Sequence, residues 1–211
     1  MIRKLAYLAS AAVLWAGAAT AQEAAKPDVA KGQNIASQVC APCHAADGNS
    51  TGPANPKLAG QFYEYLHKQL SNFKSQGGKK AERENPVMAG MVANLSDADM
   101  RDVAAYFASQ KLKPAVAKSK DLAAAGQKLY RAGNAAGGVP ACAGCHGPTG
   151  AGIPTEFPRI AGQFQEYTEA QLKAFRSGAR ANDPASMMRT VAGRLTDQEI
   201  QAIADYVAGL R

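Results

Sequence analysis

The feature that most constrains this chain is a pentapeptide, Cys-x-x-Cys-His, that occurs twice and uses every cysteine. It appears as CAPCH at 40–44 and as CAGCH at 142–146, a spacing of 102 residues. The same spacing relates LAGQFYEYLHKQLSNFKS at 58–75 to IAGQFQEYTEAQLKAFRS at 160–177. A constant spacing between two different motifs indicates an internal duplication. The sequence therefore predicts two related domains, each with one copy of the pentapeptide.

The N-terminus has the pattern of a secretory signal. Arg3 and Lys4 precede an apolar stretch at 5–19, and Ala-Thr-Ala at 19–21 is a small-x-small cleavage pattern. We expect residues 1–21 to be removed after Ala21, which leaves 22 basic and 17 acidic residues and a formal charge of +5. This modest charge suits acidic protein partners, an anionic membrane surface or plain solubility. An exported chain without a dense basic stripe is not expected to bind nucleic acid.

Both halves have the periodicity of helices. The segments LSDADMRDVAAYFAS at 95–109 and LTDQEIQAIADYVAG at 195–209 place apolar residues on one face, behind the N-cap candidates Ser96 and Thr196. Thr196 and Glu199 also fit a capping box, and no run alternates as a strand does. We expect an all-α protein of two tandem domains, and the predicted boundaries are 22–112 for the first domain, 113–120 for a linker and 121–211 for the second domain.

The pentapeptide has the spacing of a c-type haem attachment site. Two thiols two residues apart form thioethers to the haem, and the adjacent histidine reaches the iron as its proximal ligand. Other interpretations fit less well: a thioredoxin-like pair needs a βαβ context, and no fourth ligand lies at zinc-like spacing. Two covalent haem c groups are therefore predicted, one held by Cys40, Cys43 and His44, the other by Cys142, Cys145 and His146.

The second axial ligand is indicated by comparing the repeats. His67 is the only other histidine and its counterpart is Glu169, so a shared role as ligand is not expected. At a spacing of 100 residues, Met88 matches Met188, whereas Met91 and Met187 each match a valine. We predict Met88 and Met188 as distal iron ligands, with core packing, the usual role of methionine, as the alternative.

Matching loops also suggest what surrounds each site. A ligating imidazole normally donates its other N–H to a carbonyl or carboxylate, and the carbonyls of Pro56 and Pro158 are our candidates, loop stiffening being the alternative. Gly32 and Gly126 lie where the first helix of each domain is expected to approach the last one closely.

The mature chain resembles the dihaem cytochrome c4 family over its whole length. The resemblance lies in the paired pentapeptides, the repeated Leu/Ile-Ala-Gly-Gln-Phe loop and the segment MAGMVANLSDADMRDVAAYFASQ at 88–110. The resemblance implies two class I cytochrome c folds, with haem propionate edges facing each other across the domain interface. It implies periplasmic electron transfer by a monomer loosely associated with the membrane, from a donor such as a cytochrome bc complex towards a terminal oxidase. The implied axial ligands are His44, Met88, His146 and Met188.

With both axial positions filled, neither iron offers a site for substrate, so we expect an electron carrier and not an enzyme. The alternative is the electron-draining subunit of a dehydrogenase, since the cytochrome subunit of sulfide-oxidising flavocytochromes is also similar to a tandem dihaem chain. A dihaem peroxidase would need an iron that opens to peroxide, and the matched methionines argue against it. No Ser-His-Asp group, phosphate-binding loop or paired-carboxylate site stands out.

Overall fold

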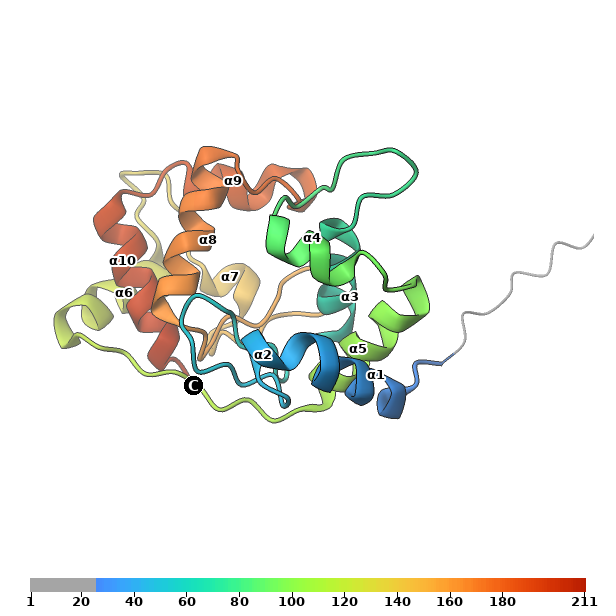
Figure 1. Cartoon of the computed structure of the whole chain (residues 1–211). Coiled ribbons are helices and arrows are strands. Elements are labelled where there is room, and N and C mark those ends of the chain that lie inside the picture. The colour runs from blue at the N-terminus through green and yellow to red at the C-terminus, as the bar shows by residue number, and fades with distance from the viewer. Residues whose placement is uncertain (1–25) are drawn as a thin grey trace, which may run out of the picture.

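The computed structural model describes residues 26–211, and the predicted signal sequence lies outside the described residues. In this part of the chain, helices and loops build two domains that lie side by side, and no strand forms (Figure 1). The predicted all-α architecture is confirmed. None of the helices between residues 26 and 211 is long and apolar enough to cross a membrane.

The two domains repeat one order of elements. The first contains α1 Val29–Ile35, the π-helical segment η1 Ala36–Cys40, α2 Ala41–His44, α3 Tyr63–Phe73, α4 Pro86–Val92 and α5 Asp97–Ser109. The second contains α6 Lys120–Ala132, α7 Ala143–His146, α8 Gln165–Ser177, the 3-10 segment η2 Pro184–Ser186, α9 Met187–Ala192 and α10 Asp197–Gly209.

The first and last helices of each domain cross at very short range, as the glycines predicted. A Cβ on Gly32 of α1 would lie 2.1 Å from the carbonyl oxygen of Asp102 on α5. A Cβ on Gly126 of α6 would lie 2.0 Å from the carbonyl oxygen of Ala202 on α10. Only a residue without a side chain allows the two backbones to approach this closely.

Helices α5 and α10 begin and pack as their sequences predict. The Thr196 hydroxyl accepts the N–H of Glu199 and the Glu199 carboxylate accepts the N–H of Thr196, which completes the expected capping box. Ser96 and Asp99 form a second such box at the start of α5. The apolar faces are buried in two cores, which contain Val103, Ala104 and Phe107 in the first domain and Ile200, Ile203 and Val207 in the second.

The connection between the domains is fastened along its length. It runs in an extended conformation past both domains, along the lower edge of the view in Figure 1. The N–H of Lys113 donates to Asn49 Oδ1 at 2.7 Å, in the first domain. The N–H of Lys118 donates to the buried Asp205 Oδ1 at 2.7 Å, in the second. The linker therefore fixes the relation of the two domains and is not a free spacer.

Candidate functional site

The cysteine motif continues the first helical segment in the first domain, and in the second domain it lies at a separate short helix after a loop. Cys40 ends η1 and Cys43 lies in α2, while Cys142 precedes α7 and Cys145 lies within it. None of the four is in a disulfide. Burial raises the pKa of the Cys40 and Cys142 thiols to about 11, so both are apolar neighbours and not thiolates. Among residues 26–211, no group of three or more His, Cys, Asp or Glu side chains is arranged to hold a metal ion.

The two motif histidines are buried and held in the same way. His44 Nδ1 lies 2.9 Å from the carbonyl oxygen of Pro56, and His146 Nδ1 lies 2.9 Å from that of Pro158. Because a carbonyl only accepts, Nδ1 carries the proton and donates it, which leaves the lone pair on Nε2. Burial lowers the pKa of both imidazoles, although the bond to the proline carbonyl opposes this. Each ring is therefore a neutral imidazole with Nε2 available as a ligand.

The repeat-matched methionines are less exposed than their neighbours Met91 and Met187. Met88 on α4 and Met188 on α9 are half-buried, whereas Met91 and Met187 are 46% and 37% exposed. Met188 packs against the core of the second domain, as Cys142 does. At the start of α4, the Asn85 side chain accepts the N–H of Met88 at 3.0 Å, which fixes the first turn of that helix.

His67 has a different neighbour altogether. Its Nε2 lies 2.7 Å from Asp97 Oδ1, across the surface between α3 and α5, and its side chain is 24% exposed. It is therefore paired with a carboxylate at the surface.

Two arginines lie buried between the domains without a carboxylate partner. Arg83 and Arg180 are 9% and 7% exposed, and no ion pair is formed by either within the described chain. Their guanidinium groups donate only to neutral side chains, and these acceptors are Gln69, Gln171, Tyr65, Tyr167 and Asn182. A buried permanent charge is costly unless an anion compensates it.

This cluster suits an anionic cofactor edge. Burial alone would raise the pKa of the Tyr65 phenol, but the charges of Arg180 and Arg83 outweigh it and lower that pKa. A more acidic phenol is a better hydrogen-bond donor to an anion. Haem carries two propionate carboxylates, which two buried positive charges would suit. The thiols, the free Nε2 atoms and the half-buried methionines fit the attachment and ligation of two haem groups.

This interface cluster was not predicted from the sequence. Tyr65 and Gln69 of α3 are identical to Tyr167 and Gln171 of α8 at a spacing of 102, and this identity of polar helix residues was an available signal. The arginines carried no such signal, because they lie in loops of different length in the two repeats.

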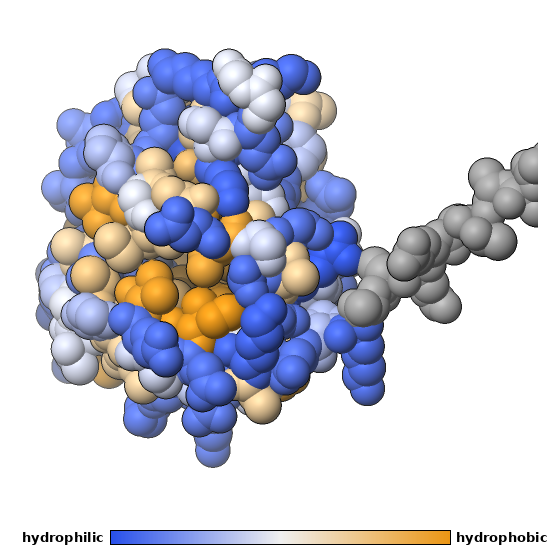
Figure 2. Space-filling view, turned by 45° about the vertical axis from the view of Figure 1, so that its right-hand side comes forward, coloured by the Kyte–Doolittle hydropathy of each residue, from blue (hydrophilic) through white to orange (hydrophobic). Residues whose placement is uncertain are grey.

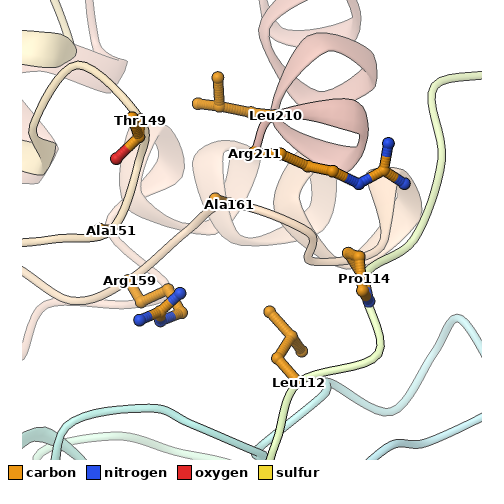
Figure 3. Close-up of a pocket in the computed structure, with 8 residues that line it drawn as sticks. All are labelled: Leu112, Pro114, Thr149, Ala151, Arg159, Ala161, Leu210 and Arg211. Atoms are coloured by element: carbon orange, nitrogen blue, oxygen red, sulfur yellow. The ribbon is translucent and has the colours of Figure 1, made fainter.

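The surface combines apolar and charged regions. Figure 2 shows strongly hydrophobic side chains gathered on one face and framed by hydrophilic ones. A separate cavity of about 230 Å³ lies between the linker and the C-terminal end of α10 (Figure 3). It is lined by Leu112, Pro114, Arg159 and Leu210 among others, and by none of the predicted site residues. The cavity is therefore distinct from the two candidate haem sites.

Comparisons with known proteins give a consistent result. A family model described as cytochrome c matches the chain twice, at residues 29–111 and 123–211. Cytochrome c4 of Pseudomonas aeruginosa is 47% identical over 185 residues, which span 87% of this chain and 89% of that protein. The crystal structure of reduced recombinant cytochrome c4 from Pseudomonas stutzeri superposes with a TM-score of 0.82 at 42% identity, covering 88% of this chain and all of that one.

A third relative has a more specific description. The thiosulfate dehydrogenase electron acceptor of Stutzerimonas stutzeri is 37% identical over 203 residues, which cover 95% of this chain and 92% of that protein. With two family matches, each around one cysteine pair, the chain carries two covalent haem c groups and acts in electron transfer, not as an enzyme. It belongs to the dihaem cytochrome c4 family.

Proposed function

We propose that this chain is a periplasmic, monomeric carrier that passes single electrons between respiratory-chain partners through two His/Met-ligated haems. In this proposal thioethers form at Cys40, Cys43, Cys142 and Cys145, the axial ligands are His44, Met88, His146 and Met188, and the carbonyls of Pro56 and Pro158 hold the histidine rings. A bound haem c supplies a one-electron ferric/ferrous couple.

One observation carries the proposal: each domain has a buried, neutral histidine whose Nδ1 is already engaged and a repeat-matched methionine that is half-buried. If these two side chains occupy both axial positions, no position remains for a substrate. Methionine ligation also raises the reduction potential. A site closed in this way transfers electrons with little rearrangement, which is the requirement of a carrier.

The remainder of each domain keeps this arrangement rigid. Tyr130, which is fully buried on α6, donates its hydroxyl proton to the carbonyl of Gly147 at 2.5 Å, directly after His146. Tyr106 does the same to Ala46 at 2.9 Å, two residues after His44. Each proximal loop is therefore tied to the helix crossing of its own domain. Family membership supports a donor such as a cytochrome bc complex and a terminal oxidase as acceptor, with loose membrane association.

A second function is favoured by one comparison. The 37% identity to a thiosulfate dehydrogenase electron acceptor supports a role in draining electrons from a dehydrogenase. The same closed irons would serve this role equally well. The two functions differ in the donor, because the dehydrogenase would deliver electrons one at a time to this chain while it oxidises its own substrate.

Stopped-flow absorbance distinguishes the two functions with the intact dihaem protein. The reduced protein is mixed with membranes that contain terminal oxidase, and the oxidised protein is mixed with thiosulfate dehydrogenase and thiosulfate. If membranes oxidise the protein rapidly and cyanide abolishes this oxidation, the result supports the respiratory carrier. Rapid reduction by the dehydrogenase, with slow oxidation by membranes, supports the second function. Slow exchange in both directions contradicts the proposal.

A further inference from the structure

One glutamine side chain of each domain forms hydrogen bonds with the backbone of the other domain. In the first domain, Gln61 follows the loop that holds the proximal histidine. Its Nε2 donates to the carbonyl of Arg159 at 2.8 Å, and its Oε1 accepts the N–H of the same residue at 3.0 Å. A side-chain amide that pairs with both polar atoms of one residue fixes the position of that backbone in the other domain.

The second domain returns the same contact. Gln163 Nε2 donates to the carbonyl of Lys57 at 2.9 Å, and Gln163 Oε1 accepts the Lys57 N–H at 2.9 Å. Each Oε1 also accepts the N–H of the residue that follows the glutamine in the sequence, Phe62 or Phe164, at 3.0 Å. These bonds determine which way each amide faces, because a flipped amide would direct its NH₂ group at two N–H donors.

The peptide groups that the glutamines hold are the ones that hold the proximal histidines. The N–H of Lys57 and the carbonyl of Pro56 belong to a single peptide group. That carbonyl accepts the proton of His44 Nδ1 at 2.9 Å, while the N–H donates to Gln163. In the second domain, the peptide between Pro158 and Arg159 joins His146 to Gln61 in the same way.

Such a chain of hydrogen bonds is cooperative. A bond accepted from the peptide N–H shifts electron density towards the carbonyl oxygen, which strengthens the bond at that oxygen by roughly 10–30%. A stronger bond at Nδ1 makes the imidazole a better donor through Nε2. A better-donating histidine favours the ferric state of the iron and lowers its reduction potential.

We propose that Gln163 and Gln61 are positioning residues that act crosswise: Gln163 sets the donor strength of His44, and Gln61 sets that of His146. The inference rests on the proposed ligation of iron by these histidines. Each haem site then depends on the docking of the opposite domain, so the interface is part of what determines both potentials.

The test uses Gln163→Leu and Gln61→Leu in the intact dihaem protein, and the two variants are matched controls for each other. They remove the same side chain from equivalent positions of one interface, so general loosening affects both sites alike. The readouts are the Nδ1–H proton shift of each histidine in the reduced, diamagnetic protein and the midpoint potential of each haem. Lines are assigned with a Cys142→Ala, Cys145→Ala variant that retains the first site alone.

For Gln163→Leu we expect the His44 Nδ1–H line to move upfield and the first-domain potential to rise, with the His146 line unchanged. For Gln61→Leu we expect the mirror result. Equal shifts at both sites, shifts confined to the mutated domain, or no shift overturn the inference. If a leucine variant does not assemble, the same measurements are made on the Gln→Met variant at that position. Methionine keeps the side-chain length and removes the amide, so the same outcomes support or overturn the inference.

A different result would contradict the proposed function. If the wild-type protein lacks the spectrum of His/Met-ligated low-spin haem, the ligand assignment is wrong. If that spectrum is present and unchanged in the variants while the crossed shifts are absent, only this inference is wrong.

Discussion

The close crossing of α6 and α10 gives a prediction whose size follows from the structure. In Gly126→Ala, the new Cβ would lie 2.0 Å from the oxygen and 2.6 Å from the carbon of the Ala202 carbonyl, and 2.7 Å from Tyr206 Cβ. These are backbone atoms and a first side-chain atom, so no rotamer change relieves the overlap. A carbon–oxygen contact relaxes near 3.3 Å, so the helices must separate by about 1.3 Å.

The energetic cost has two parts. Forcing an extra carbon into a packed core costs about 1–3 kcal/mol, and a gap of 0.5–1 Å removes a quarter to a half of each dispersion contact across it. Alanine returns only about 0.5–1 kcal/mol as a better helix former than glycine. Since the two costs add and the gain from alanine offsets only part of them, we expect a net loss of about 2 kcal/mol, and a fall in the unfolding midpoint of the second domain of roughly 8–16 °C.

The assay is thermal unfolding of the holoprotein, followed by circular dichroism and by the haem absorbance. Tyr130 ties α6 to the carbonyl after His146, so the second haem should lose its Met–iron band at a lower temperature than the first. Gly90→Ala on α4 is the matched control, because its Cβ would have no atom within 4 Å. A loss under about 1 kcal/mol in Gly126→Ala, or one no larger than in Gly90→Ala, would refute the reasoning.

Four further predictions concern the sites and the charges around them. Cys142→Ala with Cys145→Ala leaves one covalent haem by mass spectrometry, and two remaining haems would refute the attachment. Met88→Ala makes the first iron bind carbon monoxide and Met91→Ala does not; the reverse result would assign the ligand to Met91. Arg180→Met removes a buried charge and its hydrogen bonds, so it costs about 1–3 kcal/mol of stability and lowers both reduction potentials. In denaturant unfolding, Arg131→Met at an exposed position stays within about 0.5 kcal/mol of the wild type. Equal effects of the two substitutions would show that the interface charge is unimportant. Hydrogen bonds from Lys31 and Ser96 lower the pKa of Asp99 from 3.8 to about 2, so the contribution of this carboxylate to folding stability is present above pH 4 and is lost as the pH falls towards 2. Asp99→Asn should therefore make the stability of the protein less dependent on pH in this range. An unchanged dependence on pH would contradict this.

Features set by local sequence were predictable. The buried faces of α5 and α10 follow from 3.6-residue periodicity, and the glycine crossings follow from the repeat, because each copy keeps a glycine at the same place. The capping box at Ser96 went unnoticed because its third residue is Asp99, and not the Glu or Gln of the usual pattern.

Features that depend on distant partners were not predictable in the same way. Gln61 and Gln163 are identical in the two repeats, yet their partners are 98 and 106 residues away and belong to the other domain. The linker has a composition typical of a flexible spacer, and its hydrogen bonds to distant residues such as Asn49 and Asp205 become visible only in the folded protein. Buried Arg83 and Arg180 depend on both domains at once, so no pattern within one repeat indicates them.

The central claim is that both irons are closed by protein ligands, and visible spectroscopy of the purified holoprotein tests it most directly. Spectra are recorded in the ferric and ferrous states, before and after addition of carbon monoxide. The account predicts two low-spin haems with Met–iron bands in the ferric state and ferrous spectra that carbon monoxide leaves unchanged. Rapid binding of carbon monoxide to either haem would mean an accessible iron, and would contradict the symmetrical His/Met carrier.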